Sequence, residues 1–235
     1  MENGTKTVER LLHETLCEAL KYSIRYEDFV GAMASAYGFR PKKVAYAKLV
    51  GKIETLIEVM RKQSIKHFRT EVDSVNLLRN LISGRKAIEK AYLIDDLGLP
   101  EIYALAKNFG YSNLSLKVMI NEVGNTQTFK NIFGVNYMNE LSRILGAQLI
   151  TRQDRLVHEI FSRWVSYDEL LRLMEKLLPT RLLEIIDAAP AIIIADHGYD
   201  IEHSGGYYRL CHGSECRKAL FSMICPIILV SGRIS

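Results

Sequence analysis

The chain has 235 residues, of which 48% are hydrophobic and 25% are charged; this composition is typical of a folded protein and excludes a disordered one. No apolar run approaches the roughly 18 to 20 residues that a membrane-spanning helix needs. The N-terminal segment is charged and amphipathic and has no apolar signal core. We therefore expect a cytoplasmic protein without a membrane partner.

The first part of the chain has the pattern of helices. Apolar residues recur at three- and four-residue spacing from Val8 to Ala19. Similar patterns predict further helices over residues 27–37, 43–68 and 73–83. Residues 1–90 carry 17 Lys and Arg against 11 Asp and Glu, whereas residues 91–235 carry 14 against 16. We expect an all-helical, basic N-terminal module over residues 1–88 and a second domain over residues 89–235.

Strands and helices alternate in the second part. Short apolar strands are predicted from Ala91, over residues 114–120 and within residues 146–150, and each is followed by a helix. A long helix over residues 166–186 precedes a buried strand at 192–195, a loop to Arg217 and a last strand. This alternation predicts an α/β domain with a mostly parallel sheet sandwiched by helices. The strand at 192–195 is expected at its centre, because both of its faces are apolar.

Polar residues that suit metal binding or catalysis follow four successive strands. Ligands of such sheets bind beyond the carboxyl ends of the strands, so these residues are expected to converge. Each also has a structural explanation as a helix cap, a turn residue or a polar helix face. In chain order they are Asp95; Thr126 and Thr128; Asp154 and His158, one helical turn apart; Asp196 and His197; and, in the next loop, His203 and His212.

The four cysteines are a weak signal. Four residues separate Cys211 from Cys216, a spacing that suits a zinc clip or a disulfide, but no second pair lies nearby. We expect these two cysteines, and Cys17 and Cys225, to be buried reduced thiols.

Basic residues gather over residues 40–69. Residues 36–70 hold nine Lys and Arg against two Glu, and the segment resembles two helices joined by a short turn, as in helix-turn-helix units. A solvated basic helical face is the simpler interpretation. Nucleic-acid binding through residues 40–69 is the alternative.

The order of the strand-end residues resembles the alkaline phosphatase superfamily, and within it the PglZ-domain proteins. YLIDDLG resembles the family's first strand and acidic ligand, although the motif more often reads Asp-Gly where this chain has Asp95–Asp96. NTQTFKNIFG resembles the nucleophile loop of the phosphodiesterase branch. RQDRLVHEI matches the middle Asp-x-x-x-His, and IIIADHGYD matches the Asp-His-Gly. The resemblance covers about residues 90–231 and implies an alkaline phosphatase-like core.

The resemblance also implies two divalent metal ions, zinc first and manganese as the alternative, which agrees with the oxygen and nitrogen donors present. His212 is preferred to His203, because it better resembles the family's closing His before a Pro-containing strand. The implied ligands are Asp95, Asp196 and His197 for one ion, and Asp154, His158 and His212 for the other.

The function implied is that of a metal-dependent hydrolase that acts on a phosphoester, with phosphodiesters and nucleic acids among the substrates. Thr128 would be the nucleophile and Thr126 the fallback. The alternative is a nucleic-acid-binding, PglZ-like protein whose α/β domain has lost catalysis. A purely structural helical adaptor ranks last, because it gives the strand-end residues no role.

Overall fold

The computed structural model describes residues 4–39, 44–62, 78, 90–161, 163–186 and 190–231. The N-terminal helices are α1 (Gly4–Lys21), α2 (Tyr26–Ala36) and α3 (Ala47–Lys62). The elements that follow are β1 (Lys90–Ile94), α5 (Leu99–Phe109), β2 (Leu114–Ile120), α6 (Thr126–Phe133), α7 (Met138–Leu145), β3 (Gln148–Ile150), α8 (Arg152–Phe161), α9 (Tyr167–Ile185), β4 (Ala191–Ala195), β5 (Asp200–Ser204), β6 (Tyr207–Cys211) and β7 (Ile224–Val230).

The three N-terminal helices overlap predicted helical segments. α3 lies within residues 43–68, α2 begins one residue before the predicted 27–37, and α1 extends beyond Val8–Ala19 at both ends. Of the helix predicted over residues 73–83, only Leu78 is among the described residues. The described residues 37–39 and 44–46 lie between α2 and α3 and outside both helices. These six residues alone are more than the three- or four-residue turn of a helix-turn-helix unit. No helix in the described part of the chain is both long and apolar enough to cross a membrane.

The main sheet has five strands in the order β2-β7-β4-β1-β3. β1 pairs in parallel with β3 and β4, whereas β7 pairs antiparallel with β2 and β4. The expected α/β fold and the central position of the strand at 192–195 are therefore confirmed. The sheet is mixed and only partly parallel, which corrects the expectation of a mostly parallel sheet.

β7 runs against the other strands because of the connection that precedes it. A parallel partner needs a crossover, usually a helix, that returns the chain to the opposite edge of the sheet. Residues 196–223 are all described and contain only the hairpin β5–β6 and short 3-10 turns. The chain therefore stays at the edge where β4 ends, and the backbone N–H of Gly198 donates to the carbonyl of Ser222 there.

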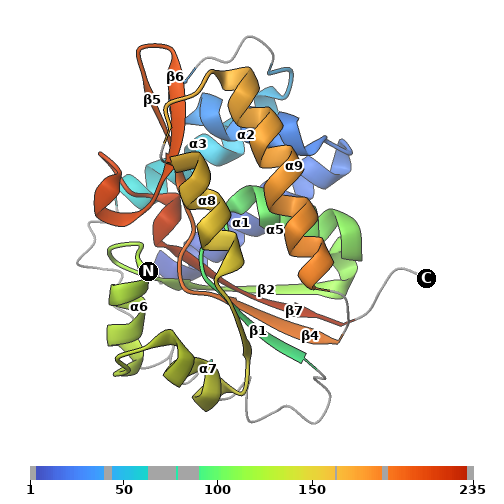
Figure 1. The fold of residues 1–235 in the computed structure, drawn as a ribbon. Coiled ribbons are helices and arrows are strands. Elements are labelled where there is room, and N and C mark those ends of the chain that lie inside the picture. Colours follow the sequence, from blue (N-terminus) through green and yellow to red (C-terminus); the bar gives the residue numbers. More distant parts are fainter. Residues whose placement is uncertain are drawn as a thin grey trace.

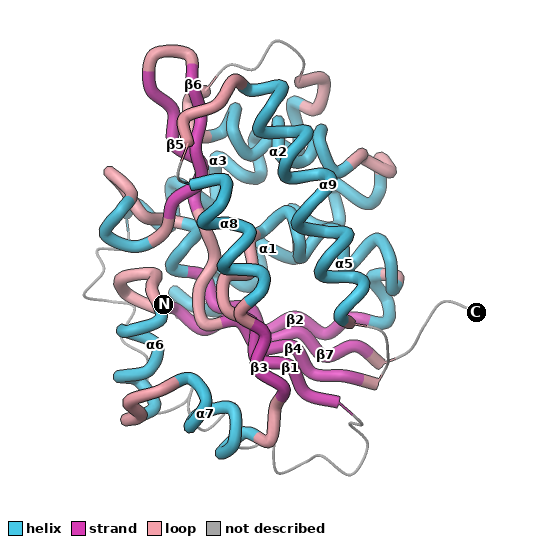
Figure 2. The backbone as a smooth tube through the Cα atoms, viewed as in Figure 1, coloured by secondary structure: helices cyan, strands magenta, loops and turns pink. Residues whose placement is uncertain are grey.

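The hairpin β5–β6 lies where the sequence predicted only a loop. Gly205 and Gly206 form its tip with φ values of 57° and 86°. Positive φ at both central residues is what a tight hairpin turn of type I′ requires, and glycine adopts it without strain. The Gly-Gly pair between two alternating runs was thus a usable signal for a hairpin. Figure 2 shows the hairpin beyond the end of the sheet, and β6 contacts α8.

Helices cover both faces of the sheet (Figure 1). One face packs against a hydrophobic core that includes residues of α1, α2, α3, α5, α8 and α9, and the other against residues of α6 and α7. Within β4, Ile193 belongs to the first core and Ile192 and Ile194 to the second. The N-terminal helices thus share a core with the sheet. The division at residue 88 stays a prediction.

The central strand gives a first prediction. Ile193 is fully buried between Tyr92 of β1 and Ile228 of β7. Ile193→Ala leaves a cavity and should lower the free energy of unfolding by about 2–5 kcal/mol. The matched control is Ile144→Ala on α7, where the side chain is 64% exposed, and it should change stability by less than about 0.5 kcal/mol. Urea unfolding of both variants measures the difference, and equal effects would contradict the central position of β4.

Candidate functional site

The expected ligand residues meet at the carboxyl ends of the parallel strands, in two groups of three. In each group the ligand atoms all lie within 4.8 Å of one another. All six residues implied by the resemblance are present and are divided as expected, while metal binding itself stays a prediction. The groups are Asp95, Asp196 and His197, which we call the inner triad, and Asp154, His158 and His212, which we call the outer triad.

The inner triad has the spacing of ligands around an ion. Nε2 of His197 lies 3.6 Å from Oδ1 of Asp95 and 3.7 Å from Oδ2 of Asp196. These distances are too long for hydrogen bonds. Donor atoms held at about 2.1 Å from a tetrahedral zinc ion are about 3.4 Å apart. The three donors thus surround a point at which a small cation fits.

The two oxygens of Asp196 have different environments. Oδ1 accepts hydrogen bonds from the backbone N–H of Asp96 at 3.2 Å and of His197 at 2.8 Å. Oδ2 is buried and has no hydrogen-bond partner among the described residues. A buried carboxylate oxygen without a donor is costly. Oδ2 is therefore suited to a cation, and the inner triad fits a metal ion on this ground as well as by its donor types.

The ring of His197 is held in the form that a metal ligand needs. It is fully buried, and Nδ1 lies 3.0 Å from the carbonyl oxygen of Gly198. A proton on Nδ1 that is donated to this carbonyl leaves the lone pair of Nε2 directed at the two carboxylates. Burial lowers the pKa of His197, which favours the neutral ring that binds metals.

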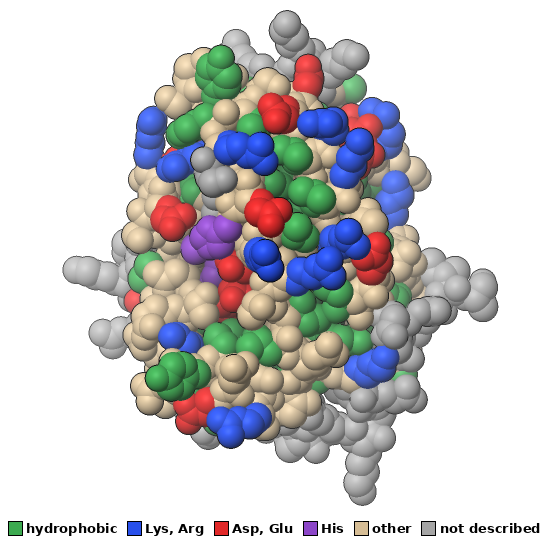
Figure 3. All heavy atoms as spheres, in the orientation of Figure 1, with side chains coloured by type: hydrophobic (Ala, Val, Ile, Leu, Met, Phe, Trp, Pro, Cys, Tyr) green, Lys and Arg blue, Asp and Glu red, His purple; other side chains and the backbone are tan. Residues whose placement is uncertain are grey.

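The outer triad is more exposed and adjoins the inner one. Nε2 of His158 lies 3.1 Å from Oδ1 of Asp154 and 3.3 Å from Nε2 of His212. The side chains of His158 and Asp154 are 44% and 25% exposed, and Figure 3 shows histidine and acidic side chains side by side on this face. The ring centroids of His212 and His197 are 4.6 Å apart. Burial and the two neighbouring rings lower the pKa of His212 to about 3.

Burial raises the pKa of the inner carboxyls. The pKa of Asp95 is raised to about 8 by burial and by the charge of Asp196, and the pKa of Asp196 is raised to about 7 by burial. Burial also raises the pKa of Asp154. Acidic groups with raised pKa values, brought together without a compensating positive charge, are what a divalent cation would stabilise in their ionised form.

Thr126, rather than Thr128, contacts the inner triad. Its hydroxyl donates to Oδ1 of Asp95 at 3.2 Å and lies 3.3 Å from Nε2 of His197. Thr126 is the first residue of α6, and Asn125 caps the helix by accepting a hydrogen bond from the backbone N–H of Thr128. Residues two positions apart on a helix point in different directions. No hydrogen bond of the described residues joins the hydroxyl of Thr128 to the triads, so the geometry favours the fallback residue.

His203 lies outside both triads. Its ring packs against Phe39, with ring centroids 5.0 Å apart, and against Tyr208, with centroids 4.8 Å apart. The structure thus brings His212 to the candidate ligands and leaves His203 in an aromatic cluster on the hairpin.

Sequence reasoning missed Asn121, which organises the loop before Thr126. Asn121 is fully buried after β2. Its Nδ2 donates to the carbonyl oxygens of Asn125 at 2.7 Å and Asp196 at 3.0 Å, and its Oδ1 accepts from the N–H of Gly124 at 3.0 Å. One side chain thus ties the end of β2 to the end of β4. Its position directly after a strand was the available signal.

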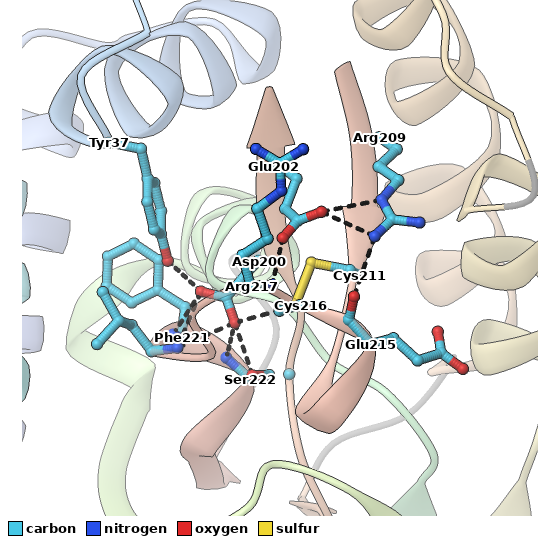
Figure 4. Close-up of a disulfide and its surroundings, with 12 residues drawn as sticks. Tyr37, Asp200, Glu202, Arg209, Cys211, Glu215, Cys216, Arg217, Phe221 and Ser222 are labelled. Atoms are coloured by element: carbon cyan, nitrogen blue, oxygen red, sulfur yellow. Dashed lines mark hydrogen bonds and ion pairs between the residues drawn. A yellow bond between two sulfur atoms is a disulfide. The ribbon is translucent and has the colours of Figure 1, made fainter. Parts of the chain in front are cut away.

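Asp200 was also missed, and it fixes the loop that returns to β7. It is buried, and its carboxylate accepts hydrogen bonds from the backbone N–H groups of Leu220, Phe221 and Ser222 and from the hydroxyl of Tyr37. Figure 4 shows these bonds converging on the one carboxylate. Asp200 belongs to the stretch that contains the Asp-His-Gly motif, but only the fold reveals its partners.

The expectation of reduced cysteines is wrong for two of the four. Cys211 and Cys216 form a disulfide (Figure 4), while Cys17 and Cys225 are free. Cys225 is buried as expected, whereas Cys17 is exposed, which corrects the expectation of burial there. The bridge closes a short ring that contains His212. A Cβ added at Gly213 in this ring would lie 3.1 Å from the carbonyl oxygen of Gly124, so the ring lies close to the loop before Thr126. The disulfide thus restrains the loop that carries an outer-triad residue. Disulfides are rare in the cytosol, and the cytoplasmic location stays a prediction.

The raised pKa values predict how the stability of the metal-free protein depends on pH. Because the unfolded pKa of Asp is about 3.9, folded Asp95 and Asp196 retain protons that the unfolded chain has lost. The contribution of these two carboxyls to the free energy of unfolding should fall as the pH rises from about 4 toward 7 for Asp196 and 8 for Asp95, by about 1.4 kcal/mol per pH unit for each retained proton. The lowered pKa values of His197 and His212 make an opposite contribution below about pH 6.5.

Urea unfolding in EDTA from pH 5 to 8 measures this slope. Asp95→Asn should make it shallower, because the amide does not titrate. Asp168→Asn, at an exposed position in the first turn of α9, is the control and should leave it unchanged. Identical slopes for wild type and Asp95→Asn would contradict a raised pKa at Asp95.

The geometry of the candidate site has no counterpart in a matching family model or curated protein. No family model matches the chain, and no curated protein matches it. The features of the chain that bear on function are two adjoining triads of carboxylates and histidines and a threonine hydroxyl in contact with the inner triad.

Proposed function

We propose that this protein is a metal-dependent hydrolase of phosphoesters, of the alkaline phosphatase type, with Thr126 as its nucleophile. The observation that carries the proposal is the contact of the Thr126 hydroxyl with Asp95 and His197 of the inner triad. A hydroxyl beside buried candidate metal ligands is the arrangement that nucleophilic phosphoryl transfer requires.

The inner triad would hold one divalent ion and the outer triad the second, with zinc preferred for donor sets of histidine nitrogen and carboxylate oxygen, and manganese as the alternative. When bound, such ions polarise the phosphoryl oxygens and make a neighbouring hydroxyl more acidic. The short distance between the rings of His197 and His212 supports two adjoining sites rather than two independent ones.

The residues of the chain have separate tasks in this reaction. Oγ1 of Thr126 forms a bond to phosphorus while the bond from phosphorus to the leaving oxygen breaks. Oδ1 of Asp95 accepts the hydrogen bond of this hydroxyl and so orients Oγ1 at the inner triad. The proton that Oγ1 loses passes to solvent, and the leaving oxygen takes a proton from solvent. Asn121 and the helix cap Asn125 position Thr126. In the second step a water oxygen forms a bond to phosphorus while the bond from phosphorus to Oγ1 breaks, and a proton from that water restores the Thr126 hydroxyl.

Two features support the resemblance from which this proposal began. The residue after Asp95 is often glycine in the family, and here Asp96 has a φ of 68°, a left-handed conformation that glycine adopts most easily. The candidate ligand set is also complete, which favours the hydrolase over the alternative of a nucleic-acid-binding protein with a degenerate site.

Metal content provides the first test of the proposal. The wild-type protein, loaded with Zn²⁺ or Mn²⁺ and dialysed, should contain about two ions per chain by elemental analysis. Asp196→Asn and His212→Ala should each lose about one ion, because each removes a ligand from a different triad. His203→Ala is the matched control and should retain the wild-type content. A wild-type protein that retains no ion would refute the proposal.

Turnover of an activated phosphodiester, bis-(4-nitrophenyl) phosphate, provides the second test. Thr126→Ala should reduce the rate by about 10³-fold or more, with metal content unchanged, because the nucleophile is lost. Thr126→Ser should retain part of the activity, since the hydroxyl remains. Thr128→Ala is the control and should stay within about tenfold of wild type. Loss of turnover in Thr128→Ala but not in Thr126→Ala would reverse the assignment.

A further inference from the structure

Two cavities that together form a groove lie next to the loops that carry Thr126 and His212, although no triad residue lines either cavity. A cavity of about 630 Å³ is lined by Val123, from the loop that leads to Thr126, and by Gly213, which follows His212. A smaller cavity of about 220 Å³ adjoins it and extends to the rings of Phe39 and His203. The two cavities have four lining residues in common, which are Arg61, Arg217, Lys218 and Leu220.

The three basic side chains between the cavities are available to a ligand. Arg61, Arg217 and Lys218 are exposed, and within the described part of the chain none of them is in an ion pair. The acidic residues beside them are engaged elsewhere. Asp200 is saturated by the hydrogen bonds of the return loop, and Glu202 pairs with Arg209 at 2.8 Å.

Asp200 and Glu202 line the smaller cavity, and Glu122 is the acidic residue among the described residues that line the larger cavity. The groove is therefore lined by three basic side chains and by one carboxylate, that of Glu122, for which no ion pair is described. The net charge of these side chains is positive. Its charge is complementary to a ligand with more than one anionic group.

The far end of the groove is aromatic. Phe39 and His203 are half-buried, with ring centroids 5.0 Å apart, and both line the smaller cavity. Proteins bind single-stranded nucleic acids with basic side chains along the phosphate backbone and with aromatic side chains on which the bases stack. In a duplex the faces of the bases are stacked on each other and are not offered to such rings.

We propose that this groove binds a single strand of nucleic acid, with phosphates at Arg61, Arg217 and Lys218 and an unpaired base against Phe39 and His203. The inference rests on the proposed function in one respect, because the bound strand would be the substrate of the hydrolase. A phosphodiester of the strand would then lie near Gly213 and be directed toward Thr126. Binding itself requires neither metal nor catalysis, so the two proposals fail separately.

The test is the anisotropy of a fluorescein-labelled 12-nucleotide single strand of DNA, titrated with the full chain in EDTA at 50 to 200 mM NaCl. The double variant Arg217→Ala/Lys218→Ala should bind at least tenfold more weakly at the lowest salt. Its slope of log K against log salt should be less steep by about 1.4, because each phosphate contact on a single strand contributes about 0.7. Phe39→Leu should bind several-fold more weakly with the slope unchanged, since it removes a stacking ring and no charge.

The matched control is Arg172→Ala/Lys176→Ala on α9, which removes the same two residue types from exposed positions that line neither cavity. It should change the affinity by less than twofold. Equal losses in both double variants, or wild-type binding that does not respond to salt, would overturn the proposal. A 12-base-pair duplex that binds as tightly as the single strand would also overturn it. Thr126→Ala should bind like wild type, so a protein that binds the strand but hydrolyses no phosphodiester would refute only the proposed function.

Discussion

The geometry of the candidate site depends on the buried carboxylate of Asp196. Its Oδ1 is held by the backbone N–H groups of Asp96 and His197, which joins the end of β1 to the end of β4. Its backbone carbonyl accepts from the side chain of Asn121, which joins the end of β2 to the same point. Three strand ends are thus fixed relative to one residue, and Oδ2 remains directed at the triad. A buried anion is unfavourable unless other groups compensate it, and here backbone amides satisfy one oxygen only.

The mixed sheet explains how the outer triad is completed. The parallel strands bring Asp95, Asp154 and Asp196 to one edge, as the rule for the carboxyl ends of such strands predicts. His212 reaches this edge by another route. The chain after β4 stays there, forms the hairpin and enters β7 in the antiparallel direction. Had a crossover helix followed β4, the chain would have left for the opposite edge. The departure from a parallel sheet and the presence of His212 at the site therefore have the same cause.

Sequence patterns predicted the features that depend on periodicity and strand order. They did not predict the features that depend on a single contact, which are the choice of threonine and the disulfide. The centre of the sheet followed from the apolar run Ile192–Ile194, and five of the six candidate ligands followed from their places after strands. The preference for His212 over His203 followed from the family resemblance. Whether Thr126 or Thr128 faces the triad depends on where α6 begins, and that is set by the capping hydrogen bond of Asn125. The disulfide depends on a distance of 5.4 Å between the Cα atoms of Cys211 and Cys216, which spacing along the chain does not determine.

The disulfide affects which segments of the native protein unfold locally. A crosslink acts on the unfolded state by reducing its conformational entropy, and the effect grows with the length of the loop that it closes. Cys211 and Cys216 are separated by only five positions, so in the chain-entropy account the bridge contributes about 2 kcal/mol, against about 4.7 kcal/mol for a 100-residue loop. The bridge also restrains the local opening of the native segment that it closes. Because the covalent ring joins the segment around His212 to the end of β6, we expect this segment to open together with the hairpin rather than on its own.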